Sequence, residues 1–368
     1  MIADLAIFLG VLALLVLAHE FGHFLFARKF GVNVEEFGFG FPPRLGGVRR
    51  GGTLYSFNAL PLGGFVKITG EDSAPVQPGE VPDPKNFASK SIGARAMILA
   101  AGIGFNLILA YILFAAALGI GVPVAGDDDV WAGHIADLRV VAIDVAPESA
   151  AERAGIQLGD AIIGLGAENG RETLRDISVD TVQKFVQEHR GKNISVTVFR
   201  DEQEIVLGAV LPDSASPQKG ILGIAMEAIG RVDVPWWGIP WYALRMTAFV
   251  FMGTLWGIAA LIAGAISGVS VGGMISGPVG IFSIVANTLD FGASYFVTLV
   301  ATLSVNLAIV NLIPFPGLDG GRLLFVAIEK LRGRAISAVA TRFANGLGFA
   351  ILILLMVVIT YYDIRLRL

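Results

Sequence analysis

Two histidines and a glutamate form a compact group of chemically active residues in the segment HEFGH at residues 19–23. On a helix, His19 and His23 lie on one face, so both imidazoles are placed to bind one zinc ion. Glu20 lies between them, where its carboxylate is placed to take a proton from a zinc-bound water. The surrounding residues 5–26 are almost wholly apolar, and ionisable groups inside a membrane span are costly and usually functional. We therefore predict a metal site within a spanning helix, rather than two histidines satisfied by their neighbours.

A third ligand is expected, because a catalytic zinc usually has three protein ligands and an open position for water. The chain has no cysteine, and its other histidines, His134 and His189, lie in a polar segment. A carboxylate is available in a second apolar region, where Asp319 follows the run NLIPFPGL at residues 311–318. Two glycines come after Asp319, and they allow the backbone to approach another group closely. Asp319 is therefore the candidate third ligand.

The pairing of HEFGH in a first span with NLIPFPGLDGG in a late span resembles the site-2 protease family of intramembrane zinc metalloproteases. The bacterial regulator-of-sigma-E type is the most similar, and the resemblance covers nearly the whole chain. It implies that His19, His23 and Asp319 are ligands of Zn²⁺ and that Glu20 is the catalytic base. It also implies that Asn311 is a polar contact to the substrate backbone.

The composition is that of a multispanning membrane protein, with 54% hydrophobic and 16% charged residues and a mean hydropathy of +0.70. The formal net charge is −4, so no nucleic-acid footprint is visible. The absence of cysteine excludes disulfides and thiolate metal ligands.

The distribution of apolar and basic residues predicts about four transmembrane helices. They cover residues of about 4–27, 92–122, 293–316 and 345–361. The loop between the first two is rich in lysine and arginine, which places it in the cytoplasm. Both termini and the polar segment 127–233 then lie on the outer side.

Residues 241–266 are also apolar and long enough for a span. Asp319 must lie at the depth of the two histidines, however, and only one crossing then fits between the outer domain and Asp319. We therefore assign 236–268 to amphipathic helices on or partly in the outer leaflet. Three tryptophans would anchor them at the interface: Trp236, Trp237 and Trp241.

Residues 53–67 are apolar, β-prone and rich in glycine and proline. They are compatible with a hairpin packed under the membrane face. The family resemblance instead favours a membrane re-entrant β-hairpin loop, whose edge holds the substrate as an added strand. The candidate substrate-binding residues in this loop are Leu60, Gly63, Gly64, Phe65 and Val66.

The second predicted span contains Gly102-x-x-x-Asn106, a spacing of small residues that usually indicates helix packing. In the site-2 family the corresponding segment lies near the active site. The resemblance therefore also makes Asn106 a candidate for facing the substrate.

The polar segment 127–233 has the length of one small domain. Its residues 147–163 resemble a PDZ pattern, and a helix at 179–189 is expected to follow. Strands are expected at 194–199 and 204–211, with a returning strand at 220–224. The groove of such a domain binds a chain end or acts as a size filter, and both roles remain open.

Together these features predict a polytopic α-helical membrane protein with a re-entrant β-hairpin loop and one inserted extracytoplasmic PDZ-like α+β domain. The protease core occupies 1–122 and 293–368, the PDZ-like domain 127–233, and the amphipathic helices with their connector 236–292.

By resemblance, the protein is a zinc-dependent intramembrane endopeptidase of the bacterial cytoplasmic (inner) membrane that acts in regulated intramembrane proteolysis. Its expected partners are the lipid bilayer and single-pass membrane proteins that another protease has already cut outside. Membrane-bound anti-sigma factors and remnant signal peptides are the expected substrates, and the enzyme is expected to be a monomer.

Three other functions agree less well with the sequence. A catalytically inactive scaffold that binds partners through the PDZ domain would tolerate loss of Glu20 or Asp319, and both are present. A metal transporter needs polar groups spread along a path, whereas here they collect at one depth. A soluble-facing HExxH protease would keep its motif in the polar domain.

Overall fold

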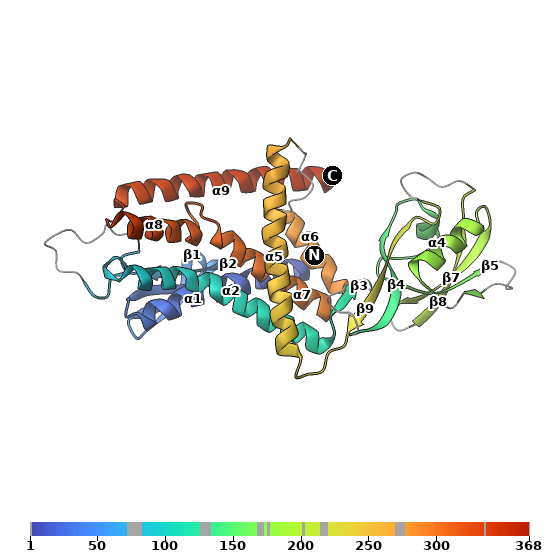
Figure 1. Cartoon of the computed structure of the whole chain (residues 1–368), viewed down its shortest axis with the longest axis horizontal. Helices are drawn as coiled ribbons and strands as arrows, with labels where there is room; N and C mark the ends of the chain where they lie inside the picture. The colour runs from blue at the N-terminus through green and yellow to red at the C-terminus, as the bar shows by residue number, and fades with distance from the viewer. Residues whose placement is uncertain are drawn as a thin grey trace. The chain divides into compact units, whose positions relative to one another are not determined.

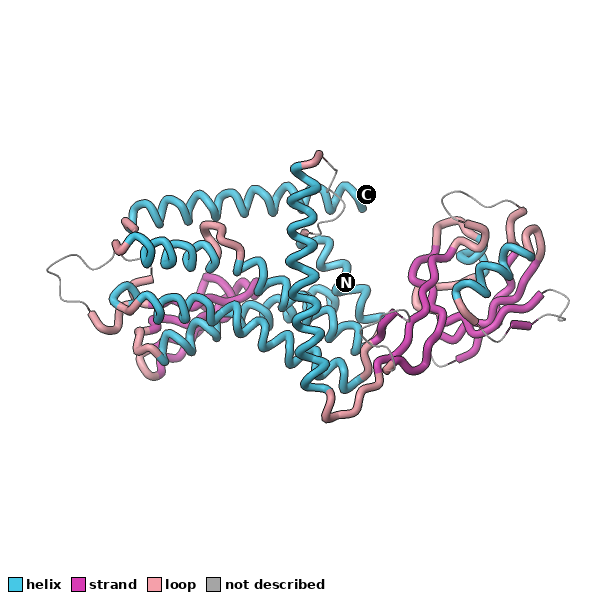
Figure 2. Tube along the Cα trace, viewed as in Figure 1, coloured by secondary structure: helices cyan, strands magenta, loops and turns pink. Residues whose placement is uncertain are grey.

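The computed structural model describes residues 2–71, 83–125, 134–167, 173–174, 177–200, 203–213, 220–268, 277–334 and 336–367. The chain forms two compact units, Met1–Ala117 with Ile239–Leu368, and Leu118–Gly238. The first consists of long helices and a two-stranded ribbon, and the second of a sheet with short helices (Figure 2). The expected start of the polar domain, at residue 127, lies outside the described residues.

Five helices of the described chain are long and apolar enough to cross a membrane. They are α1 (Ile2–Lys29), α2 (Ile92–Ile120), α5 (Ile239–Ile266), α7 (Ala293–Leu312) and α9 (Ala338–Arg367). A helix satisfies its backbone hydrogen bonds internally, which is why apolar helices are stable in lipid. The protein is therefore a multi-pass membrane protein, as expected.

The helix α5 differs from the sequence prediction of amphipathic helices over 236–268. It is one uninterrupted helix, and Arg245 is its only charged residue. Apolar side chains are exposed along it, including Trp241 and Trp256, because the sequence has no polar face of helical period. It contacts α7, where the Thr254 hydroxyl donates to Asn306 Oδ1 at 2.9 Å.

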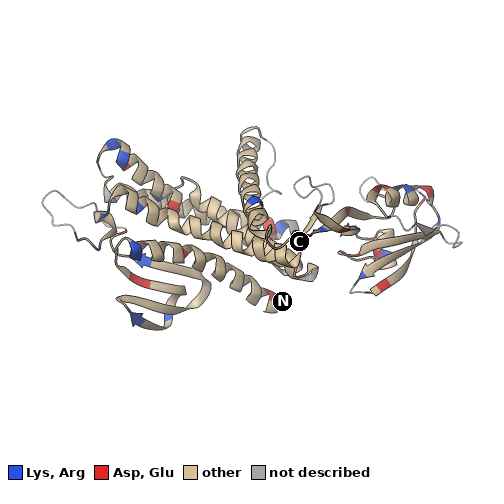
Figure 3. Cartoon of the chain, turned by 60° about the horizontal axis from the view of Figure 1, so that its bottom comes forward, with Lys and Arg blue, Asp and Glu red and all other residues tan. Residues whose placement is uncertain are grey.

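The directions of the helices separate α5 from the rest. Helices α1, α2, α7 and α9 run along the length of the first unit, and α5 crosses them (Figures 1 and 3). Lysine and arginine gather at the end of the unit where α1 ends and α2 begins (Figure 3). At the other end of α9, the buried Asp363 carboxylate accepts from the Gly280 N–H at 2.9 Å and ties α9 to α6 (Pro278–Thr288).

A long antiparallel ribbon, β1 (Val34–Arg50) and β2 (Thr53–Ile68), follows α1. It curls back on itself, because Phe37 pairs with both Tyr55 and Val66. The inner edge of the ribbon lies against α1, where two residues without side chains, Gly63 and Gly64, face Val16 and Leu17. The sequence prediction of a β-hairpin at 53–67 thus corresponds to β2, and its partner β1 was not predicted.

The second unit is a seven-stranded sheet with the order β3-β9-β4-β5-β7-β8, in which β6 pairs with β5. Its strands are β3 (Pro123–Ala125), β4 (Ile135–Val145), β5 (Ala161–Ala167), β6 (Thr173–Leu174), β7 (Asn193–Arg200), β8 (Gln203–Val210) and β9 (Ile224–Val232). Its helices are α3 (Ala150–Ala154) and α4 (Val179–Glu188).

The core of this unit forms between α4 and the sheet, with Phe185 and Val196 fully buried. The helix predicted at 179–189 and the strands predicted at 194–199 and 204–211 are present as α4, β7 and β8. The returning strand is displaced, because β9 begins only at Ile224. The PDZ-like assignment of this unit stays a prediction.

We predict that Arg200→Met lowers the thermal stability of this unit. The guanidinium of Arg200 donates to both carboxylate oxygens of Asp160 at 2.6 Å, and the Asp160 side chain is 1% exposed. Removing the cation leaves a buried charge unpaired, at a cost of about 3 kcal/mol. Thermal unfolding of the purified protein measures the change. Arg190→Met removes an exposed charge as the control, and an equal change in both variants would contradict the prediction.

Candidate active site

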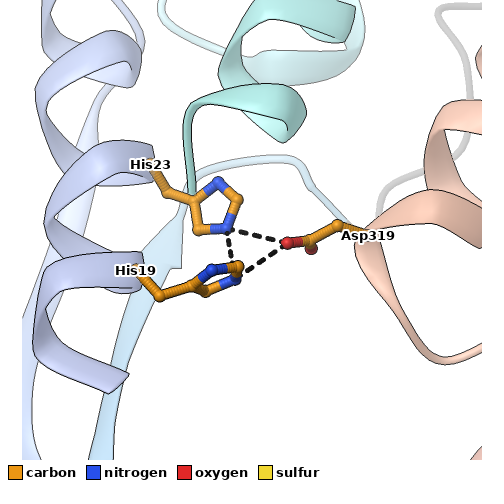
Figure 4. A group of neighbouring side chains, drawn as sticks. All are labelled: His19, His23 and Asp319. Atoms are coloured by element: carbon orange, nitrogen blue, oxygen red, sulfur yellow. Dashed lines mark hydrogen bonds and ion pairs between the residues drawn. The ribbon is translucent and has the colours of Figure 1, made fainter. Parts of the chain in front are cut away.

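Three side chains from two distant parts of the chain converge in the first unit (Figure 4). His19 and His23 lie on α1, and Asp319 begins α8 (Asp319–Arg332). Asp319 Oδ2 lies 2.9 Å from His19 Nε2 and 3.1 Å from His23 Nε2, and the two Nε2 atoms are 3.1 Å apart. The three candidate ligands predicted from the sequence therefore do meet.

These distances fit a zinc ion. Ligand atoms on a tetrahedral zinc with bonds of about 2.1 Å lie about 3.4 Å from one another. A carboxylate binds a metal in its ionised form, so Asp319 would bring one negative charge to the ion.

A backbone carbonyl orients His23. Its Nδ1 lies 2.9 Å from the Ile98 carbonyl oxygen on α2, and a carbonyl only accepts. Nδ1 therefore carries the proton, and the lone pair of Nε2 points toward Asp319. A second group that fixes the tautomer of a metal-binding histidine is typical of zinc sites.

The side chain of Asn106 lies against His19. Its Nδ2 is placed 3.3 Å from His19 Nδ1, while its Oδ1 is buried and lacks a partner in the described part of the chain. The two ends of an amide are assigned from the hydrogen-bond network. When His19 binds a metal through Nε2, its Nδ1 carries the proton, and this amide rotated by half a turn places Oδ1 to accept it.

With both histidines protonated at Nδ1, two Nε2 lone pairs face each other beside a carboxylate. Lone pairs at 3.1 Å repel unless a cation lies between them, so the donor set fits a metal ion. Asn106 therefore contacts a ligand of that ion, through an interaction that the sequence pattern of small residues did not specify.

Two glycines allow α2 to reach α1 at this point. A Cβ on Gly22 would overlap the Ala101 carbonyl, and a Cβ on Gly102 would overlap the imidazole of His23. Gly102 therefore has a second role besides the predicted helix packing. It keeps the site open, because any side chain at this position would enter it.

Glu20 shares a cavity of about 540 Å³ with the three ligands. Its Oε2 accepts from the Val66 N–H of β2 at 3.0 Å. The ribbon thereby holds the carboxylate beside the site, in the place that a general base requires.

The other predicted substrate-binding residues have different locations. Phe65 and Val66 line the cavity, and Asn106 contacts His19 behind it. Gly63 and Gly64 pack against α1, and Leu60 is exposed on the ribbon. Asn311, in the last turn of α7, is half-buried and is not among the residues that line the cavity.

Sequence reasoning missed Arg322, which also lines the cavity and pairs with Glu71. Its signal was present, because Arg322 follows Asp319 by three positions and residues at that spacing share one helix face. It also missed Asn345 at the start of the predicted last span, now part of α9, whose Oδ1 accepts from the Gly317 N–H at 3.2 Å. This bond holds the loop that leads into Asp319.

Comparison with known proteins agrees with this geometry. Residues 7–355 match the family described as Peptidase family M50. The zinc metalloprotease RasP of Oceanobacillus iheyensis is 29% identical over 97% of this chain and 98% of its own length. RasP of Geobacillus kaustophilus is 29% identical over 97% of each chain. A protein of Rhizobium meliloti is 33% identical over 97% of this chain and 95% of its own length.

We predict that Gly102→Ala removes zinc binding, whereas Gly104→Ala does not. The new methyl group at 102 displaces the His23 imidazole, while a Cβ at 104 meets nothing within 4 Å. Both changes raise helix propensity equally, so they are matched. Zinc content of the purified variants, measured by atomic emission, gives the result. Equal zinc content would show that the close approach at Gly102 is not required.

We predict that Asn106→Leu weakens zinc binding by about 10- to 100-fold, the usual effect of losing a group that orients a metal ligand. Asn106→Asp keeps an acceptor for His19 Nδ1–H and retains more of the affinity. Competition with a zinc chelator of known affinity measures both. Equal weakening by the two substitutions would contradict the proposed amide orientation.

Proposed function

The chain belongs to peptidase family M50, the site-2 type of zinc metalloprotease, and we propose that it cleaves the transmembrane segments of single-pass membrane proteins. The observation that carries this proposal is the position of the site. His19, Glu20 and His23 lie in α1, a helix apolar enough to cross a membrane, and meet Asp319 beside one cavity. A peptide bond that reaches this cavity comes from a segment within or at the edge of the bilayer.

Zinc is the cofactor, held by His19, His23 and Asp319, and when bound it supplies a Lewis acid that polarises a carbonyl and acidifies water. Glu20 provides the proton acceptor, and the Val66 N–H fixes the direction of its carboxylate. The same carboxylate then returns a proton to the amine that leaves. The ligand histidines hold their protons at Nδ1, toward Ile98 and Asn106, and so do not compete for this transfer.

The ribbon supports a proposal for how the substrate is held. A substrate helix hides its carbonyls in internal hydrogen bonds, so the segment to be cut must unwind. In lipid an unwound backbone needs partners, and the edge of β2 from Leu60 to Val66 offers them as an added strand. The Val66 N–H is already bonded to Glu20. The backbone groups that would bind the substrate therefore belong to the residues that precede Val66 on this edge. Asn311, near the end of α7, is a further polar contact in this proposal.

The PDZ-like unit and the charge distribution support a place in a two-step cleavage. Basic residues gather at the end of the first unit where α1 ends (Figure 3), and His23 lies less than two turns before that end. The positive-inside rule places this end in the cytoplasm. The PDZ-like unit would then lie outside and exclude substrates whose outer domain is intact. Substrates of this kind are anti-sigma factors or remnant signal peptides of the bacterial inner membrane, in regulated intramembrane proteolysis.

Glu20→Gln is the variant that tests this function. In detergent, we expect it to retain zinc and to cleave a pre-trimmed single-span substrate at least about 100-fold more slowly than the wild type, because general base catalysis contributes about this much. Gel analysis of the substrate and metal analysis of the enzyme measure both.

The outcomes separate the alternatives. Equal cleavage by wild type and variant would refute a role for this site. A folded wild type that binds no zinc and cleaves nothing would favour the inactive scaffold that binds partners through its PDZ-like unit.

A further inference from the structure

A second cavity, of about 550 Å³, lies where the end of α1 meets the turn of the ribbon. Its lining residues are Arg28, Arg50, Gly51 and Tyr55. The turn approaches α1 closely, because a Cβ on Gly51 would lie 3.7 Å from a guanidinium nitrogen of Arg28. Two guanidinium groups thus border one cavity.

The two arginines share this cavity without a counter-charge. Arg28 lies over the Phe24 ring at 5.6 Å, and no ion pair joins Arg28 or Arg50 to a carboxylate within the residues that the structure describes. Like charges that border one space repel, and an anion between them removes the repulsion. Planar guanidinium groups bind phosphate oxygens especially well.

An apolar strip continues from these arginines along the ribbon. Cross-strand partners point to the same face, and the pairs on this face are Arg50 with Thr53, Val48 with Tyr55, and Gly46 with Phe57. Val48 is 69% and Phe57 54% exposed. Tyr55 fixes the side on which this strip lies, because its ring packs against Phe24 of α1 at 6.1 Å.

The strip runs along the outer part of the ribbon. Its far end is Phe57, which stacks on Phe39 at 5.2 Å. From Arg50 to Gly46, the partner of Phe57, the strand rises about 13 Å. A charged end is therefore followed by about 13 Å of strand that carries exposed apolar side chains.

We propose that this surface binds an anionic phospholipid, with the phosphate between Arg28 and Arg50 and an acyl chain along Val48 and Phe57. A phosphodiester satisfies the two cations, and only a lipid also covers the apolar strip. The lipid would join α1 to the outer part of the ribbon, whose inner edge holds Glu20. This site shares no residue with the cavity of the metal ligands.

The test measures lipid binding by the whole protein in detergent, with native mass spectrometry, for phosphatidylglycerol and phosphatidylcholine of identical chains. Each arginine near an anionic lipid contributes about fivefold in affinity. We therefore expect Arg28→Gln/Arg50→Gln to bind phosphatidylglycerol about 30-fold more weakly, with a smaller loss for phosphatidylcholine, whose choline cation offsets the phosphate charge. Zinc content verifies that the variant is folded around its metal site.

Arg332→Gln/Arg334→Gln is the matched control, because it also removes two exposed arginine charges from the first unit. An equal loss in the control, or no loss in the test variant, would overturn the proposal by showing that only general charge attracts the lipid.

A second arm separates the lipid from a free phosphate. Val48→Asp keeps both arginines and places a charge on the apolar strip, so we expect it to weaken phosphatidylglycerol binding. An excess of inorganic phosphate or glycerol phosphate should fail to displace the lipid. Unchanged binding by the Val48 variant together with complete displacement would overturn the lipid assignment and leave a simple phosphate site.

Discussion

The structure depends on bringing two imidazole lone pairs and a carboxylate together inside an apolar helical unit. Such groups are costly to bury unless each is paired. Each candidate ligand is held by a further contact. Ile98 contacts His23, Asn106 contacts His19, and Asn345 holds the loop that precedes Asp319. A cation bound by all three groups would offset this cost and allow the site to exist beside α1.

Close backbone approach makes this arrangement possible. Gly22 and Gly102 let α2 come near enough to place the Ile98 carbonyl and Asn106 behind the histidines. On the opposite side, Asn345 and the buried Gly348 of α9 hold the loop around Gly317 that delivers Asp319. Helices from the beginning, middle and end of the chain therefore cooperate on one ion. A small change in packing at any of them moves a ligand.

The ribbon connects this site to its surroundings. One edge lies along α1 and gives the Val66 N–H to Glu20, so the base is positioned by a strand and not only by its own helix. The outer part carries exposed apolar residues and ends at the two arginines beside the end of α1. The inner edge of a single curled hairpin therefore binds Glu20, and in our proposal its outer part binds the lipid.

The sequence by itself indicated the candidate ligands, the candidate base and the membrane setting, because His19, Glu20 and His23 follow a helical spacing and apolar runs reveal spans without tertiary information. Only the tertiary structure decided how Asn106, Arg322 and Asn345 act, since their partners lie far away in the chain. It also showed that β1 extends the ribbon and that α5 is a single apolar helix. Contacts between distant segments leave no periodic signal in the sequence, and packing alone selects them.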